Sequence, residues 1–204
     1  VKLQYLLFDN CYMANVETAY ALRQATNWLV ASTSEIMAMG MPYAAMWRYL
    51  GSATPSYGNM VSTFHTFYEA YPTPSGALSA IDCRQMDALA SIMRNINSRY
   101  ALPQAMVDSL QVLDGFATPL FFDLGDYVDH LCANATLLSD FHAQLKRAVP
   151  YAASTQTLYS YLYDHPVYIP VNTFSGITIS DPSTSSVAEK GKKNTEWWKA
   201  THEE

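Results

Sequence analysis

The sequence has 204 residues, of which 50% are hydrophobic and only 15% are charged, and its formal net charge is −6. This composition predicts one globular domain with a sizeable core and argues against a disordered chain. An acidic chain lacks the basic face that nucleic acids require, so nucleic acid is not an expected partner. No apolar stretch reaches the ~18 residues that a membrane-spanning helix needs, so no membrane span is expected.

The first residues predict a buried strand, then a helix, then a second strand. Residues 2–8 form a near-continuous apolar run, which is typical of a strand buried on both faces of a parallel sheet. Asn15 is the expected N-cap of the helix, with Glu17 in its first turn. A second apolar run, 28–31, predicts the next strand. Because the chain begins inside a buried-strand pattern without an initiator Met, we expect it to be part of a longer precursor.

The rest of the chain alternates between amphipathic patterns, short apolar runs and turn-rich segments. The amphipathic patterns predict helices over residues 42–50, 60–71, 84–100, 103–113, 126–133 and 137–148. Strands are expected at 77–82, in the tyrosine-rich alternating segment 157–169, and at 175–180. A surface loop is expected over 181–194, and the tryptophans of 196–200 are expected to dock on the core.

Polar residues gather where the first two strands end. Asp9-Asn10-Cys11 follows the first strand, and Ser32 to Glu35 follows the second. Ligands of open α/β sheets bind outside the carboxyl ends of the strands, so Cys11 is a candidate functional residue. The alternative is a buried structural cysteine, since Cys packs as a small hydrophobe. We expect that structural role for Cys83 and Cys132, which lie in apolar helical surroundings.

The segment from Leu6 to Tyr20 resembles the nucleophile segment of clostripain-like cysteine peptidases, which belong to the caspase-like clan. Asp9-Asn10-Cys11 with Met13 and a following helix that contains a Glu carries this resemblance. Three further blocks resemble the family in the same order, at residues 29–43, at 79–82, and at 176–179 with 196–200. The sequence departs from the family pattern at Asn10, where a small residue is usual.

The resemblance implies the fold class and the domain organisation. The expected fold is a caspase-like three-layer α/β/α sandwich with a mostly parallel sheet. Residues 1–204 would be the C-terminal part of a single peptidase domain, completed by an upstream N-terminal segment. The family's catalytic His precedes the Cys in sequence, and none of the ten residues before Cys11 is a His. We therefore expect that His on a preceding segment or on a separate chain of the same precursor, released by self-processing.

The resemblance also implies roles for four residues. Cys11 would be the thiolate nucleophile, and its own backbone N–H would help to hold the oxyanion. Asp9 would lie at the floor of the S1 pocket and pair with the Arg or Lys after which this family cuts. Ser32 and Ser34 would line the other side of that pocket. The expected partners are protein or peptide substrates with a basic P1 residue, together with the N-terminal chain of the same precursor.

The acidic residues and the histidines give no clear metal site and no clear catalytic base. The spacing of Asp123, Asp126 and Asp129 lacks the geometry of a calcium loop, so we expect a solvated face. Some members of the family use calcium, which leaves calcium open as a cofactor. Each of the five histidines is expected to be structural or solvated, His165 being the best substitute base among them. The family is largely bacterial with many exported members, which implies an extracytoplasmic location.

Two functions follow from these observations. The first is a cysteine endopeptidase that cleaves after Arg or Lys through Cys11, with its His supplied by an upstream segment. The second is a catalytically silent homologue that acts as a binding or structural module of a bacterial cell envelope. The missing His and the unusual Asn10 motivate the second. The reactivity of the Cys11 thiol distinguishes the two.

Overall fold

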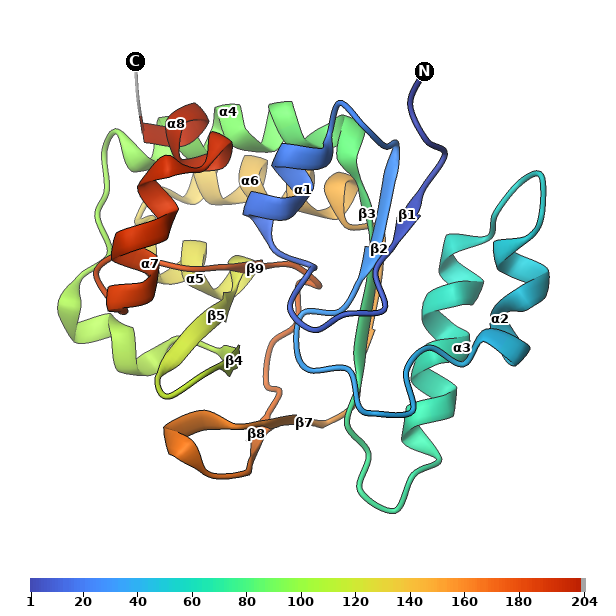
Figure 1. Ribbon diagram of the computed structural model, residues 1–204. Coiled ribbons are helices and arrows are strands. Elements are labelled where there is room, and N and C mark those ends of the chain that lie inside the picture. The colour runs from blue at the N-terminus through green and yellow to red at the C-terminus, as the bar shows by residue number, and fades with distance from the viewer. Residues whose placement is uncertain (203–204) are drawn as a thin grey trace.

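The computed structural model describes residues 1–202, and its centre is a four-stranded sheet with helices on both faces (Figure 1). Side chains along β2 alternate between the two faces: Leu29 and Ala31 join one core cluster, whereas Val30 joins the other. This alternation follows from the two-residue period of a strand. The strand order is β1 (Leu6–Leu7), β2 (Trp28–Ala31), β3 (Ala77–Asp82) and β6 (Tyr151–Ser154).

The prediction of a mostly parallel sheet is wrong for the described residues. Only β1 and β2 run parallel, whereas β2 pairs with β3, and β3 with β6, in the antiparallel sense. The reason lies in the connection from β2 to β3, which contains α2 (Tyr43–Leu50) and α3 (Tyr57–Glu69). A single crossover helix carries the chain back to the start of a parallel strand, but two packed helices return it to the end it left.

Strand β1 is shorter and more exposed than its apolar sequence predicts. Only Leu6–Leu7 is extended in the sheet, both residues are half-buried, and Leu3 is exposed. Among the described residues β1 has a neighbour on one side only, namely β2. The expectation of burial on both faces is therefore not met by residues 1–202.

One face of the sheet is covered by α1 (Val16–Leu22), α4 (Met86–Asn97) and α6 (Ala135–Ala148). Their buried side chains, such as Leu89, Met93 and Phe141, form the larger core cluster. The predicted N-cap of α1 is confirmed, because the side chain of Asn15 accepts a hydrogen bond from the backbone N–H of Thr18 at 2.8 Å. This cap fixes where α1 begins, directly after the segment that contains Cys11.

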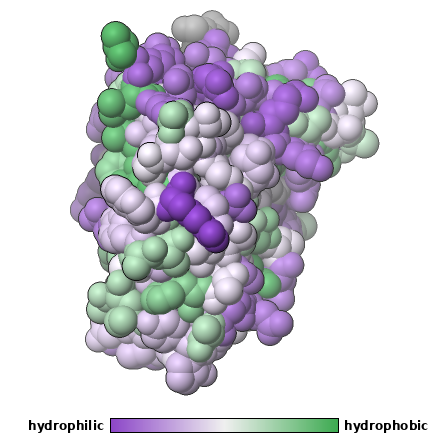
Figure 2. Space-filling model, turned by 90° about the vertical axis from the view of Figure 1, so that its right-hand side faces the viewer, coloured by the Kyte–Doolittle hydropathy of each residue, from purple (hydrophilic) through white to green (hydrophobic). Residues whose placement is uncertain are grey.

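The opposite face of the sheet is covered by α2 and α3. Figure 2 looks onto this side of the molecule and shows apolar patches scattered among hydrophilic ones. Met39, Tyr43 and Trp47 are the large exposed hydrophobic side chains of α2 and the loop before it. Within residues 1–202, we find no helix whose length and apolar character would let it cross a membrane.

A second, three-stranded sheet lies beside the first and was only partly predicted. Its order is β4 (Val112–Gly115), β5 (Pro119–Asp123), β9 (Thr178–Ile179), and α5 (Leu124–Leu131) follows β5. The helix expected over 103–113 is wrong: a short 3-10 helix, Gln104–Ser109, precedes β4. Pairing of Val112 with Phe122 outweighs the helical spacing of the apolar residues in this segment.

The tyrosine-rich segment forms the predicted extended structure. It folds into an antiparallel hairpin of β7 (Thr157–Ser160) and β8 (Val167–Pro170). The turn between the strands contains two residues with left-handed backbone angles, Tyr163 and Asp164, at φ of 56° and 60°. The hairpin packs against β4.

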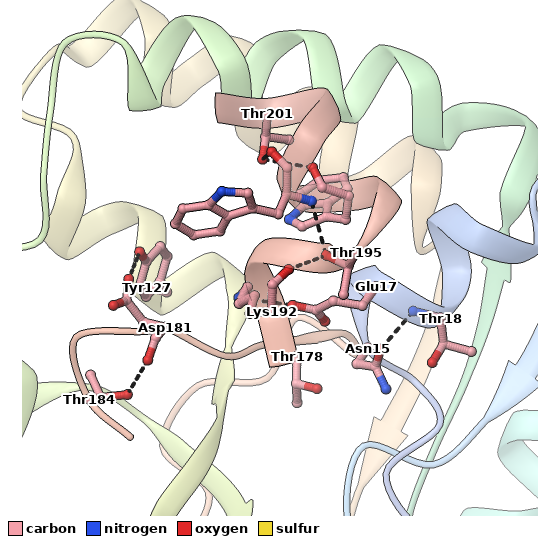
Figure 3. Close-up of polar contacts among 12 residues, drawn as sticks. Asn15, Glu17, Thr18, Tyr127, Thr178, Asp181, Thr184, Lys192, Thr195 and Thr201 are labelled. Atoms are coloured by element: carbon pink, nitrogen blue, oxygen red, sulfur yellow. Dashed lines mark hydrogen bonds and ion pairs between the residues drawn. The ribbon is translucent and has the colours of Figure 1, made fainter. Parts of the chain in front are cut away.

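Residues 181–202 contain more regular structure than the sequence predicts. The segment 181–194, expected to be a surface loop, contains α7 (Ser186–Gly191) and a 3-10 helix, Lys192–Asn194. Lys192 is buried, and its Nζ lies 2.9 Å from Oε1 of Glu17 on α1 (Figure 3). The predicted docking of a tryptophan is confirmed, because Trp197 of α8 (Glu196–His202) is buried edge-on against Tyr20.

Candidate active site

The candidate site is built on residues 9–12, here called the nucleophile turn, which connect β1 to α1. The turn is held by the segment that leaves β2, residues 32–42, here called the β2 loop. Backbone N–H groups of Tyr12 and Ala14 donate to the carbonyl oxygens of Ser34 and Ser32, at 3.1 and 2.8 Å. The two segments therefore form one unit at the carboxyl ends of the two parallel strands.

The thiol of Cys11 faces the β2 loop and is partly buried. Its Sγ accepts a hydrogen bond from the backbone N–H of Ile36 at 3.3 Å and lies 3.9 Å from the carbonyl oxygen of the same residue. The position of the sulfur therefore depends on the conformation of the β2 loop. A displacement of Ile36 would move the backbone N–H that donates to the Cys11 sulfur.

The carboxylate of Asp9 is exposed and is oriented by the far end of the β2 loop. Oδ1 accepts from the backbone N–H of Met41 at 3.1 Å, and Oδ2 accepts from the hydroxyl of Tyr43 at 3.0 Å. Burial and this hydrogen bond raise the pKa of Tyr43, so its hydroxyl stays protonated and donates. A carboxylate offers about four acceptor positions, so the two contacts leave room for a cationic ligand.

The backbone next to the Asp9 carboxylate requires a glycine at position 40. Its φ is +66°, and a Cβ at this position would lie 3.2 Å from Oδ2 of Asp9. The carbonyl oxygen of Gly40 accepts a hydrogen bond of 2.7 Å from the hydroxyl of Tyr68, a buried residue of α3. Residues 40–41 thus run between Tyr68 and Asp9 with no space for a side chain at position 40.

Ser32 and Ser34 are fully buried behind the nucleophile turn. The hydroxyl of Ser32 donates to the carbonyl oxygen of Ser34 at 3.0 Å, and its Oγ accepts from the backbone N–H of Ser34 at 3.2 Å. These bonds close a tight turn at the start of the β2 loop. In this structure Asp9 and Cys11 share the loop as a common support. The hydroxyl of Ser32 stabilises that loop from within, whereas Oγ of Ser34 is buried and makes no hydrogen bond within the described residues.

Three residues of the site were missed in the sequence: Tyr12, Glu35 and Asp114. The Tyr12 hydroxyl donates to Oε1 of Glu35 at 3.0 Å, and the backbone N–H of Glu35 donates to Oδ2 of Asp114 at 2.8 Å. Asp114 is fully buried, and burial raises its pKa to about 7. A signal for it exists in the sequence, because Asp114 directly follows the apolar pair Val112-Leu113, and a carboxylate buried beside such residues needs hydrogen-bond donors.

The remaining cysteines and the histidines lie elsewhere. Cys83 and Cys132 are buried, as expected of core cysteines, and burial raises the pKa of Cys83 to about 12. Among residues 1–202, none of the five histidines is hydrogen-bonded to Cys11. Their ring nitrogens have other partners, such as the carbonyl oxygen of Tyr163 for His165 and the carboxylate of Asp129 for His142.

The solvated face that we expected at Asp123, Asp126 and Asp129 is present only at Asp129, which is exposed. Asp123 is buried, caps α5 through the backbone N–H of Asp126 at 3.0 Å, and accepts the hydroxyl of Ser175 at 2.9 Å. Asp129 pairs with His142 at 2.7 Å. Over the described part of the chain, no group of three or more His, Cys, Asp or Glu side chains is placed to hold a metal ion.

Cys11 thus lies at the carboxyl end of a sheet strand, where ligands of α/β folds bind, two residues after the exposed carboxylate of Asp9. Residues 1–169 match the family model described as the clostripain family, peptidase C11. The chain therefore belongs to the clostripain family of cysteine peptidases. The search of curated proteins returned no match.

Solved structures of C11 peptidases share the whole of this fold. A clostripain from Bacteroides thetaiotaomicron ATCC 29148, bound to the peptide inhibitor BTN-VLTK-AOMK, is 48% identical with a TM-score of 0.93, over 100% of this chain and 89% of that one. A secreted C11 protease of the same species, iotapain, is 47% identical with a TM-score of 0.93, over 99% and 56%. An inactive zymogen C11 protease from Parabacteroides distasonis is 27% identical with a TM-score of 0.87, over 99% and 59%.

Proposed function

We propose that this chain carries the nucleophile of a cysteine endopeptidase that cleaves peptide bonds after Arg or Lys. The observation that supports it best is the shared support of Asp9 and Cys11. The carboxylate is held by Met41 and the sulfur by Ile36, two residues of the same β2 loop. When the basic side chain of a substrate binds Asp9, the scissile carbonyl group is placed next to the thiol. This follows because the β2 loop holds both Asp9 and Cys11 at a fixed distance from each other.

The proposed reaction proceeds by acyl transfer. The Cys11 thiolate attacks the carbonyl carbon of the basic residue, which forms a C–S bond and a tetrahedral intermediate. Collapse of this intermediate breaks the C–N bond and leaves an acyl-enzyme. The leaving amine takes a proton from the imidazolium of the catalytic His. A water molecule, deprotonated by the same His, then attacks the acyl carbon and releases the Cys11 thiolate. The backbone N–H of Cys11 is the donor we propose for the oxyanion of each tetrahedral intermediate.

Asp9 is the proposed determinant of specificity. Its carboxylate is exposed and keeps free acceptor positions beside the donors Met41 and Tyr43. A guanidinium or ammonium group forms charge-assisted hydrogen bonds with such a carboxylate. The inhibitor bound to the B. thetaiotaomicron clostripain supports this assignment, since its peptide, VLTK, ends in lysine. Ser32 and Ser34 act in this proposal by shaping the pocket wall.

The catalytic His is proposed to come from an upstream segment of the same precursor, as the resemblance to the family implies. Residues 1–204 would then be the C-terminal part of one caspase-like domain. The edge of β1 that no strand of residues 1–202 pairs with is the proposed place where upstream strands complete the sheet. The inactive zymogen among the relatives supports a precursor that needs processing. The relative described as secreted supports an extracytoplasmic location.

The test is hydrolysis of short fluorogenic peptides that differ only at P1, by the full protein that contains this chain. We expect cleavage after Arg and Lys, little cleavage after Leu or Asp, and none by the Cys11→Ala variant. Cys83→Ala is the matched control, because Cys83 is a buried core thiol. Cleavage after Leu or Asp with none after Arg or Lys would disprove the role of Asp9.

The catalytically silent homologue remains the second candidate, motivated by Asn10 and by the histidines of residues 1–202, none of which hydrogen-bonds Cys11. It predicts that Cys11 reacts with iodoacetamide no faster than Cys83 or Cys132 at neutral pH. A peptidase nucleophile reacts as the thiolate and is alkylated first. Peptide mapping after brief alkylation measures the three thiols in one sample. Because Cys83 and Cys132 are buried, the silent homologue is excluded only if Cys11 is also alkylated faster than free cysteine at the same pH.

A further inference from the structure

Tyr12 has an unusual backbone conformation directly after the nucleophile. Its φ is 64°, in the left-handed region that costs a non-glycine residue about 1–2 kcal/mol. Such a conformation persists only when neighbouring contacts hold it, and it sets the direction in which the preceding side chain leaves the turn. The groups that hold Tyr12 therefore act on Cys11.

Three contacts hold Tyr12 in place. Its backbone N–H donates to the carbonyl oxygen of Ser34, and its hydroxyl donates to the carboxylate of Glu35. Its ring stacks on Phe121 of β5, with 5.0 Å between centroids and 8° between planes. Burial raises the pKa of the Tyr12 hydroxyl, so the group remains a donor at physiological pH. Two of these contacts are made by consecutive residues of the β2 loop.

Asp114 connects that loop to the second sheet. It lies in β4, opposite Phe121, and is fully buried. Oδ2 accepts from the backbone N–H of Glu35, while Oδ1 accepts from the backbone N–H of Gly115 and from the hydroxyl of Ser160 in β7. Both oxygens are thus used as acceptors, which an amide of the same shape could not reproduce.

We propose that Asp114 is a positioning residue of the peptidase: its carboxylate holds the backbone of Glu35, and through the β2 loop it fixes the turn at Tyr12 that orients Cys11. Ile36, whose N–H contacts Sγ, is the next residue after the one that Asp114 holds. The inference rests on the proposed function, because it assigns to Asp114 the alignment of that nucleophile. Asp114 itself makes no contact with the sulfur among the described residues.

The ionised form of Asp114 is the one that holds the loop. Burial raises the pKa of Asp114 to about 7 against the hydrogen bonds from Ser160, Gly115 and Glu35, which lower it. The titratable groups that face it are Glu35 of the β2 loop and Tyr12 of the nucleophile turn, while β5 presents Phe121 and β7 presents Ser160. Protonation places an O–H on a carboxyl group that is surrounded by donors, so the bond to Glu35 weakens as the pH falls below 7.

The experiment compares Asp114→Asn with the native enzyme in the full protein that contains this chain. One readout is the rate of Cys11 alkylation by iodoacetamide across pH 5.5–9, followed by peptide mapping with Cys83 as internal reference. The other is kcat and KM on an Arg peptide. We expect alkylation and kcat to fall by about tenfold or more, because small misplacements of a reacting group are costly. We expect KM to change by less than about threefold, since the contacts of Asp9 are intact.

A second variant keeps the test valid if Asp114→Asn fails to fold. Ser160→Ala removes one of the hydrogen bonds that lower the pKa of Asp114, so the rise of Cys11 alkylation with pH should move to higher pH. An unchanged pH profile in a folded Ser160→Ala protein would overturn the proposal. Because alkylation needs no peptide substrate, this result is independent of whether the native protein hydrolyses any peptide.

Asp123 and Ser175 supply the matched control pair. Asp123 is also a buried strand carboxylate held by a serine hydroxyl, but its hydrogen bonds go to Asp126 and Ser175. Asp123→Asn and Ser175→Ala should therefore lower stability and leave the pH profile of Cys11 alkylation as in the native protein. If the two pairs of variants change alkylation and kcat alike, Asp114 has only a general structural role and the proposal fails.

Discussion

The hydroxyl of Tyr43 donates a hydrogen bond to Oδ2 of Asp9 at 3.0 Å, across 34 residues of sequence. Tyr43 is the first residue of α2, and Met41 lies near the end of the β2 loop. The Tyr43 hydroxyl and the Met41 backbone N–H each donate to one oxygen of the Asp9 carboxylate. The carboxylate is therefore oriented before any substrate arrives. A preorganised charge of this kind binds a cationic side chain without the cost of ordering its own rotamer.

Replacing Asp9 by Asn should remove the preference for basic substrates. The charge-assisted bond to the substrate is worth about 1.5–3 kcal/mol, so we expect kcat/KM on Arg and Lys peptides to fall about 10- to 100-fold. Tyr43→Phe should cost about fivefold, because it loosens the carboxylate without removing its charge. Steady-state kinetics with P1-matched peptides measures both. Equal kcat/KM of Asp9→Asn and native enzyme on an Arg peptide would contradict the assignment.

Replacing Gly40 by Ala should damage the same pocket through the backbone. The residue has φ +66° and a notional Cβ 3.2 Å from Oδ2 of Asp9, so Ala brings both strain and a displaced carboxylate. We expect a loss of about 1–2 kcal/mol in the free energy of unfolding and a raised KM for basic peptides. Gly191→Ala is the control, since nothing lies within 4 Å of a Cβ there. If Gly40→Ala and Gly191→Ala have the same KM for basic peptides, the backbone at position 40 is not part of the pocket.

Much of the fold near the site could be predicted because it is encoded locally. The apolar run 28–31, the N-cap Asn15 and the turn residues around Pro42 each determine their element without distant partners. The direction of β3 could not be predicted in this way. It depends on α2 and α3 packing as a pair, and their spacing in sequence is equally consistent with a crossover connection.

The supporting residues of the site are set by contacts that are distant in sequence. Asp114 meets Glu35 across 79 residues, and Ser160 meets Asp114 across 46. No periodicity or spacing predicts such pairs, because they arise from the docking of the second sheet against the β2 loop. Lys192 was missed for a similar reason: its Ser- and Lys-rich surroundings predict a loop, yet its ammonium group is buried against Glu17.

Stability should fall as the pH rises through the titration of Asp114. Its pKa is about 7 in the folded protein and about 3.9 in an unfolded chain, so the folded state binds the extra proton between those values. The free energy of unfolding therefore decreases from about pH 4 to above pH 7, by up to about 4 kcal/mol from this group. Urea unfolding at pH 5 and pH 8 measures the change.

The Asp114→Asn variant gives the control for this pH dependence. It removes the titration, so the difference in stability between pH 5 and pH 8 should shrink relative to the native protein. Asp123 also titrates with a raised pKa because of its burial, and it contributes a slope of the same sign in both proteins. An identical pH dependence in native protein and variant would mean that Asp114 stays ionised throughout.

The buried ion pair between Glu17 and Lys192 should couple the C-terminal segment to the helix that follows the nucleophile (Figure 3). The two atoms are 2.9 Å apart but poorly aligned for a hydrogen bond, so the attraction is mainly between charges. Breaking such a pair leaves an uncompensated buried charge, so Glu17→Gln should cost about 3–5 kcal/mol of unfolding free energy.

A double-mutant cycle separates that penalty from the attraction itself. Lys192→Met in the Glu17→Gln background removes the orphaned charge, so the double variant should be more stable than Glu17→Gln alone. Glu196→Gln is the control, because the pair of Glu196 with Lys199 is exposed and contributes little. Urea unfolding of the native protein, of the single variants Glu17→Gln and Lys192→Met, and of the double variant gives the coupling energy. Strictly additive effects would mean that the pair lies close in space without holding the C-terminal segment to α1.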